Sequence, residues 1–318
     1  MMPVRNEAWV LPHSLACLSG FADVILVSDR GSEDGSREIY RRFPRVVALD
    51  AAFDHRIRQQ RWQLLDAARD YAGQNLLWSC DADELVSPGL MTRFLDGARE
   101  RLQSGAVVEA RLYTLWHGAT RYRSGQTSYA PHWKRLGFVD DRRADYDRSS
   151  PTALHEPRIP APPAEPGLRA EDPRVLHLQY AVPARNQMKQ AWYRCREWLD
   201  GGKTAAAINE FYAITLPERR ARTAPVPPEW VADVTVPDLA ADREPTWHEA
   251  DIRRWFDRHG AERFEPLEIW HVEALAREFR RRVGRRPRPE RSYRRPWPAR
   301  LGAGARRALG AARRRLRS

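Results

Sequence analysis

The sequence has few cysteines and no long apolar run. Three cysteines occur in 318 residues, Cys17, Cys80 and Cys195, and their spacing matches no metal site. Their odd number favours a reducing compartment, where disulfides are rare. No apolar run approaches the roughly 20 residues that cross a bilayer, and the first residues lack the basic and apolar regions of a signal peptide. We therefore expect a cytoplasmic protein, either free or peripheral on the inner face of the plasma membrane.

Glycine-rich phosphate loops are also missing. No G-x-G-x-x-G follows an expected strand, which argues against a dehydrogenase. A nucleotidyltransferase would be expected to carry a glycine-rich loop near its N-terminus, and Val4-Arg5-Asn6-Glu7 is not one. The sequence thus disfavours these two classes of nucleotide-dependent enzyme.

The positive charge is concentrated at the C-terminal end. Residues 279–318 hold 16 arginines and one acidic residue, so they account for the net charge of +12 and the rest is near neutral. This distribution does not indicate a diffuse basic face for nucleic acid. A helix over residues 300–317 would carry one apolar stripe, and we expect residues 297–318 to contact an anionic membrane surface. A disordered solubilising tail or a nucleic-acid contact remains the alternative.

Strands and helices are expected to alternate along the first half of the chain. The expected strands cover residues 22–28, 46–49, 76–80, 107–116 and 175–180. The expected helices cover residues 37–43, 55–71, 88–102, 185–199, 251–259 and 269–283. This alternation predicts an α/β fold with a mostly parallel sheet and helices on both faces. Only Pro3 and Val4 are left to form a first strand before Arg5.

Three regions are expected along the chain. Residues 1–200 would form the α/β domain, and residues 201–283 a helical, proline-rich extension. Residues 284–318 would form an Arg-rich tail, whose first part is too rich in Arg and Pro to fold alone.

Two acidic turns follow expected strands. Asp29 leaves the first of them, and Asp81 and Asp83 leave the strand that ends at Cys80. Ligands of open parallel α/β sheets bind beyond the carboxyl ends of the strands. A hard cation such as Mg²⁺ or Mn²⁺ takes few protein oxygens and completes its shell with phosphates, so two carboxylates on one turn suit it. The alternative is an exposed acidic turn. Asp34 and Ser36 are expected to cap the next helix.

Three segments in this order resemble family 2 glycosyltransferases of the GT-A fold. They are Arg5-Asn6-Glu7, the turn Ser28–Ser36 after a hydrophobic strand, and Leu77–Leu85 with its D-x-D pattern. The resemblance covers residues 1 to about 200 and implies a Rossmann-like nucleotide-diphospho-sugar transferase fold. Arg30 stands where the family often has a second acidic residue.

The resemblance implies a role for several residues. Arg5, Asn6, Glu7 and Asp29 would line the nucleoside pocket. Asp81 would approach the ribose or the metal, and Asp83 would be a metal ligand.

Two further residues come from elements expected to lie nearby. His177 resembles a histidine that approaches the metal or the diphosphate in related enzymes, and imidazole can bind Mn²⁺. A buried core histidine is the alternative. Arg61, on the helix before the acidic strand, could reach the diphosphate, or it could lie on a solvated helix face.

The candidate catalytic base is Glu156. Leu154-His155-Glu156-Pro157 resembles a His-Glu element of some subfamilies, and an inverting transfer needs a base that deprotonates the acceptor hydroxyl. An ordinary loop glutamate is the alternative. Four aromatic residues could hold a sugar acceptor, although core packing would also explain them: Trp116, Tyr122, Tyr129 and Trp133.

The sequence therefore predicts a metal-assisted, inverting glycosyltransferase. It would transfer a sugar from a nucleotide-diphosphate sugar to a cell-envelope glycan or a lipid-linked saccharide. The alternatives are a nucleotidyltransferase and a non-catalytic protein that binds nucleotide or nucleic acid through the basic tail. The second of these leaves the acidic turn unexplained.

Overall fold

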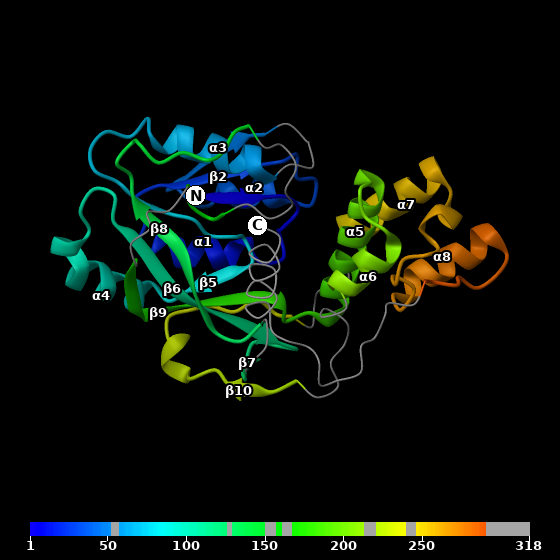
Figure 1. Ribbon diagram of the computed structural model, residues 1–318. Coiled ribbons are helices and arrows are strands. Elements are labelled where there is room, and N and C mark those ends of the chain that lie inside the picture. The colour runs from blue at the N-terminus through cyan, green and yellow to red at the C-terminus, as the bar shows by residue number, and fades with distance from the viewer. Residues whose placement is uncertain are drawn as a thin grey trace, which may run out of the picture. The chain divides into compact units, whose positions relative to one another are not determined.

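The computed structural model describes residues 1–51, 57–125, 129–149, 157–160, 167–212, 221–239 and 246–290 (Figure 1). The chain divides into two compact units. The first comprises Met1–Arg123, Tyr129–Ala181 and Thr223–Asp242, and the second Ser124–Ser128, Val182–Arg222 and Arg243–Ser318.

The first unit begins with a parallel sheet of three strands in the order β1-β2-β3. These strands are β1 (Met2–Val4), β2 (Ile25–Asp29) and β3 (Val46–Asp50). Successive side chains of a strand point to opposite faces. Leu26 accordingly packs in the apolar cluster of α3 (Ile57–Ala68), whereas Ile25 and Val27 pack with α1 (Leu11–Ser19) and α2 (Ser36–Tyr40). Figure 1 shows α3 and α1 on either side of β2. The expected α/β class, with a parallel sheet between helices, is confirmed.

The second sheet of this unit has seven strands and is mixed. Its order is β10-β7-β6-β8-β4, and β9 pairs with both β5 and β6. Its strands are β4 (Leu76–Trp78), β5 (Glu84–Val86), β6 (Val107–Trp116), β7 (Arg121–Arg123), β8 (His132–Val139), β9 (Leu168–Tyr180) and β10 (Thr223–Pro225). β6 and β9 are parallel, and the other pairings are antiparallel. Of these strands the sequence indicated β4, β6 and β9, whereas β5, β7, β8 and β10 lie in segments without a clear strand pattern.

The proline-rich segment after residue 222, expected to belong to a helical extension, is part of the first unit. β10 pairs with β7, and Trp230 lies 4.5 Å from the ring of Tyr113. Asp233 accepts a hydrogen bond of 2.6 Å from the backbone N–H of Gly89, in the first turn of α4 (Pro88–Ala98). The segment therefore contributes to the core of the first unit.

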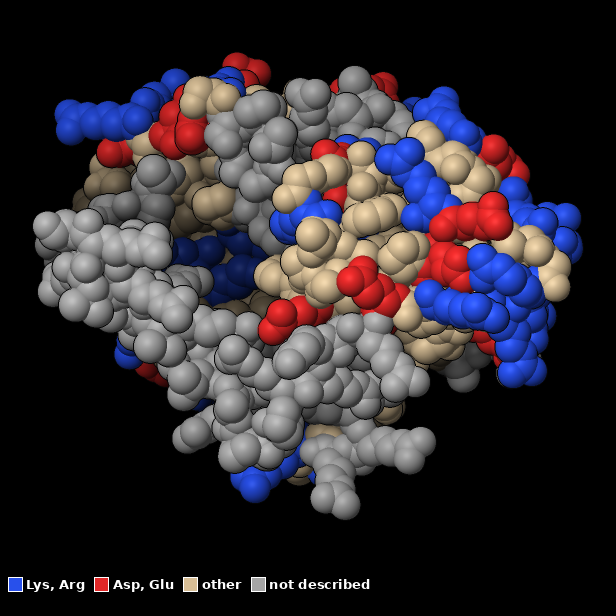
Figure 2. Space-filling view, turned by 45° about the vertical axis from the view of Figure 1, so that its right-hand side comes forward, with Lys and Arg blue, Asp and Glu red and all other residues tan. Residues whose placement is uncertain are grey.

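The second unit is helical. It contains α5 (Pro183–Asp200), α6 (Ala205–Tyr212), α7 (Trp247–His259) and α8 (Glu273–Val283). The sequence placed α5 in a domain ending at residue 200. Its buried side chains, among them Ala191 and Cys195, instead pack with those of α6, α7 and α8 in one apolar cluster. On the surface of the second unit, arginine and acidic side chains alternate, as the right-hand part of Figure 2 shows.

No helix in the described part of the chain has both the length and the apolar character needed to span a bilayer. The helix expected over residues 300–317 lies outside the described residues.

Candidate functional site

The turn after β2 is held by Asp29. This side chain is 1% exposed, and its Oδ1 accepts the backbone N–H of Ser32 at 2.7 Å. Its Oδ2 accepts the hydroxyl of Tyr40 at 2.6 Å, and burial together with this carboxylate raises the pKa of Tyr40. Both carboxylate oxygens thus have internal partners. The contact of Asp29 with a nucleobase stays a prediction.

The N-terminal segment lies directly on this turn. The backbone N–H of Asn6 donates to Oγ of Ser32 at 2.8 Å, and its Oδ1 accepts the N–H of Glu33 at 2.7 Å. Asn6 has a positive φ of 53°, which asparagine tolerates better than most residues. The N–H of Glu7 donates to Oγ of Ser36 at 3.1 Å. The structure thus places Arg5-Asn6-Glu7 beside the turn after β2, the two segments assigned to the nucleoside.

Two adjacent residues of α3 join this turn to the acidic turn after β4. The side-chain amide of Gln60 donates to the carbonyl of Ser28, at the end of β2, at 2.6 Å. The next residue, Arg61, donates to Oγ of Ser79 at 2.6 Å and to Oδ1 of Asp81 at 3.0 Å. Arg61 is 5% exposed and therefore does not lie on a solvated helix face. Two adjacent side chains of α3 thus hydrogen-bond to both of the turns that are predicted to bind ligand.

Besides Arg61, Asp81 has a second cationic neighbour, Arg158, which also contacts Glu84. The Arg158 guanidinium donates to Oε1 of Glu84 at 2.7 Å and forms an ion pair with Oδ2 of Asp81. Burial by itself raises the pKa of Asp81, but Arg158 and Arg61 bring it below its usual value. Asp81 therefore stays ionised, and both of its oxygens face arginines.

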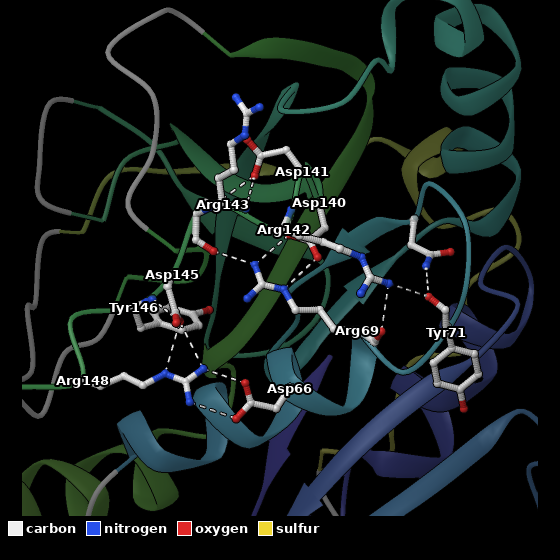
Figure 3. A network of polar contacts seen from close by, with 12 residues as sticks. Asp66, Arg69, Tyr71, Asp140, Asp141, Arg142, Arg143, Asp145, Tyr146 and Arg148 are labelled. Atoms are coloured by element: carbon white, nitrogen blue, oxygen red, sulfur yellow. Dashed lines mark hydrogen bonds and ion pairs between the residues drawn. The ribbon is translucent and has the colours of Figure 1, made fainter.

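Arg158 is held in place from its backbone. The hydroxyl of Tyr146, a buried residue, donates to the carbonyl of Arg158 at 3.1 Å. Residues 140–148, which carry Tyr146, are fastened to the C-terminal part of α3 and to Arg69, the residue after it, by the ion pairs drawn in Figure 3. Arg69 donates two bonds of 2.9 Å to Asp140, and Arg148 donates bonds of 3.0 and 2.6 Å to Asp66. α3 thus positions Arg61 directly and Arg158 through this network.

Asp83 and His177 come together at the pairing of β5 with β9. Glu84 is in register with His177, and the N–H of Leu178 donates to the carbonyl of Asp83 at 2.8 Å. Nε2 of His177 lies 3.4 Å from Oδ1 of Asp83. The described residues contain no group of three or more His, Cys, Asp or Glu side chains that could hold a metal. A cation that takes few protein ligands fits the Asp83 and His177 pair, whereas Asp81 is turned to the arginines.

The remaining predicted site residues are the candidate base and the aromatic residues. Glu156 is not among the described residues; in sequence it precedes Arg158 by two positions. Trp116 stacks on Tyr180 with ring centroids 5.2 Å apart, and Tyr129 contacts the same ring at 4.7 Å. Tyr180 ends β9, three residues after His177, and Trp116 ends β6.

The other two aromatic residues do not join this cluster. Tyr122 packs against Tyr113 and Trp230, with ring centroids at 5.0 and 5.6 Å. The guanidinium of Arg169 lies over the ring of Trp133 at 5.0 Å. Core packing therefore accounts for Tyr122.

Sequence reasoning missed Arg158 and Lys134. Arg158 and Glu84 are 74 residues apart, and no periodic pattern links them. Lys134 stands on β8, a strand that is not among those expected from the sequence. The one signal for Lys134 is its rarity, because lysine occurs three times in the chain.

A cavity of about 710 Å³ opens at the amino ends of β2 and β4. Its lining is largely apolar and includes Phe21, Val24, Leu76 and Met91. It contains none of the residues predicted for the nucleotide, so it is separate from the candidate site.

No protein-family model and no curated protein matches the chain. Among solved structures, it is similar to S. aureus TarS (11% identity over 68% of this chain and 42% of that one, TM-score 0.35). It is also similar to TarS 1-349 in complex with UDP (10% identity, 86% and 82% covered, TM-score 0.35) and to GalNAc-T7 with UDP, GalNAc and Mn²⁺ (11% identity, 67% and 53% covered, TM-score 0.39). The chain thus spans less than half the length of the first of these. Scores this low carry no argument about fold or function, which rest on the geometry above.

Proposed function

We propose that this chain is a glycosyltransferase that uses a nucleotide-diphosphate sugar as its donor. The observation that carries the proposal is the charged cluster after β4, where Asp81, Asp83 and Glu84 lie among Arg61, Arg158 and His177. Transfer of the sugar releases a nucleoside diphosphate, whose developing negative charge must be neutralised by cations placed beforehand. The adjoining turn after β2, with Arg5, Asn6 and Glu7 on it, would receive the nucleoside.

A divalent cation, Mn²⁺ or Mg²⁺, belongs to this proposal. Asp83 and His177 would hold it, and it would neutralise charge on the leaving diphosphate. Asp81, held between Arg61 and Arg158, would lie near the ribose or the metal.

The acceptor hydroxyl needs a base, and we assign Glu156 to this role. Its closeness in sequence to Arg158, which is anchored at the acidic turn, supports the assignment. The base would remove the hydroxyl proton as the oxygen attacks the anomeric carbon. Such a direct displacement inverts the configuration at that carbon. Tyr129 is half-buried and would be the ring of the aromatic cluster on which a sugar acceptor packs, because Trp116 is stacked with His117 and Tyr180 and Tyr180 is buried. We propose a cell-envelope glycan or a lipid-linked saccharide as that acceptor.

The test is calorimetric titration with UDP, GDP and TDP, with and without Mn²⁺. The wild-type chain should bind one of these nucleotides, and Mn²⁺ should strengthen binding. Asp83→Ala should abolish the effect of Mn²⁺ because it removes a metal ligand, while the circular dichroism spectrum stays unchanged.

Glu156→Gln is the matched control. It should bind the donor like the wild type and lose about 10²- to 10⁴-fold in transfer rate, the usual contribution of a general base. Failure of every nucleoside diphosphate to bind the wild type would refute the proposal and favour nucleic-acid binding by the tail. Asp83→Ala with an undiminished Mn²⁺ effect would remove Asp83 from the metal.

A further inference from the structure

Lys134 lies next to the charged cluster without taking part in its ion pairs. β8 pairs with β4, and the backbone N–H of Ser79 donates to the carbonyl of Leu136 at 2.7 Å. β8 therefore runs alongside the chain that leaves β4 towards Asp81. The backbone of Lys134 pairs with Ala110 of β6, and within the described ranges its ammonium group has no hydrogen-bond or ion-pair partner. Its neighbour Trp133 contacts Arg169. Because successive side chains of a strand point to opposite faces, Lys134 lies on the other face of β8.

The field at Lys134 is that of the candidate site. Burial lowers the pKa of Lys134, Arg158 lowers it further, and Glu84 and Asp81 act in the opposite direction. These are the residues of the acidic turn and its arginine, so Lys134 lies within the electrostatic field of the cluster. It is also half-buried, which strengthens its interaction with any anion that enters.

The other two cations of the cluster are already engaged. The planar fork of an arginine matches a carboxylate, and Arg61 and Arg158 use theirs on Asp81 and Glu84. An ammonium group is a compact point charge that suits a single phosphate oxygen. Arg61 and Arg158 are paired with Asp81 and Glu84, and Asp83, which also acts on Asp81, lies beside His177 and would be engaged by the proposed metal. The ammonium group of Lys134 is therefore the cation of the cluster that is left for an anionic ligand.

We propose that Lys134 binds the diphosphate of the donor and neutralises part of its charge as the sugar leaves. This inference rests on the proposed function for its ligand, a nucleoside diphosphate. In this arrangement Lys134, on β8, would contact the phosphates. Asp83 and His177, where β5 pairs with β9, would hold the metal. Lys134 would then contact the leaving group itself.

The first test is protection from an amine-reactive label, read by mass spectrometry. The chain has three lysines, Lys134, Lys189 and Lys203, so each can be followed separately. UDP and inorganic pyrophosphate should protect Lys134, and uridine should not. Lys203, which pairs with Glu197 in the second unit, is the internal control and should label equally in all samples. Equal labelling of Lys134 with and without UDP and pyrophosphate would overturn the inference.

The second test is affinity. Lys134→Gln should weaken binding of UDP and pyrophosphate by at least tenfold and leave uridine unaffected, and Lys134→Arg should restore most of the loss. Lys203→Gln is the matched control and should bind like the wild type. Undiminished binding of UDP by Lys134→Gln would refute the role of Lys134 and leave the proposed function standing. Protection by pyrophosphate in a chain that binds no nucleotide would keep the diphosphate site and refute the function.

Discussion

Three aspartates that follow strands have three different environments. Asp29 is closed into its own turn by Ser32 and Tyr40. Asp81 lies between Arg61 and Arg158, and Asp83 is set against His177. Residue type and position in sequence indicated acidic ligands at all three. Only Asp83 combines a carboxylate oxygen with a neighbouring imidazole that a cation could share.

The ion pair of Arg158 with Glu84 leads to a prediction about stability. The Glu84 side chain is fully buried and the Arg158 side chain is 6% exposed. Arg158→Met should lower the free energy of unfolding by about 3–5 kcal/mol, because it leaves a buried charge without its partner. Urea denaturation measures this difference.

Removing the stranded carboxylate supplies the control. The double variant Arg158→Met with Glu84→Gln should regain much of the lost stability, because the charge that needed a partner has gone. If Arg158→Met unfolds at the same urea concentration as the wild type, the pair is not buried in solution.

At the scale of elements, α3 organises the candidate site. Its residues Gln60 and Arg61 reach both turns, and its C-terminal part holds the segment that carries Tyr146 (Figure 3). The same helix packs Leu64 and Leu65 against the sheet. A change at the Arg69 end should therefore be felt by Arg158 through the backbone of residues 140–148.

The Arg69 and Asp140 pair gives a pH-dependent prediction. Burial raises the pKa of Asp140, but hydrogen bonds from Arg69 and from the Arg142 backbone lower it below its usual value. A lowered pKa in the folded state stabilises the fold above the unfolded value of about 3.9, and this contribution is lost as the pH falls through the folded value. Asp140→Asn should therefore cost about 2 kcal/mol at pH 7, the typical worth of charged hydrogen bonds. The difference from the wild type should shrink below pH 4.

Urea denaturation at pH 7 and pH 3 measures both quantities. Asp96→Asn is the control, because Asp96 is 68% exposed and lies 3.8 Å from Arg99, a pair that should contribute little. A difference between Asp140→Asn and the wild type that is the same at both pH values would show that the charge of Asp140 is not its source.

At the scale of the whole molecule, the chain joins two units with separate apolar cores. The second unit has its own cluster around Phe256, Phe264 and Phe279. The candidate site lies entirely in the first unit. Donor binding should therefore depend on the first unit, and the basic C-terminal residues should contribute to a different interaction.

Deletion of residues 291–318 tests that separation. This segment holds ten arginines and no acidic residue. The wild-type chain should bind vesicles of phosphatidylglycerol, and the truncated chain should bind them at least tenfold more weakly, because each basic residue near an anionic surface contributes about 1 kcal/mol. Nucleotide binding should be unchanged. Vesicles of phosphatidylcholine are the control. Equal binding of both chains to anionic vesicles would exclude the tail as the membrane contact.

The sequence by itself determined the parallel sheet and its helices. Runs such as Ile25–Val27 are apolar because both faces of the strand are covered, and helix and strand periods are local properties of the sequence. The acidic turns were visible for the same reason, since Asp81 and Asp83 follow directly on a strand. The resemblance of three segments added the expectation that they meet.

Tertiary structure alone decided which partners these residues have. Arg158 reaches Glu84 across 74 residues, and His177 reaches Asp83 through the pairing of β5 with β9. Lys134 lies beside the cluster because β8 pairs with β4. Such contacts depend on strand order and register, which are set by burial of the whole core and leave no local period in the sequence. The acidic residues of the candidate site could therefore be predicted from the sequence, whereas the partner of each is set by the fold.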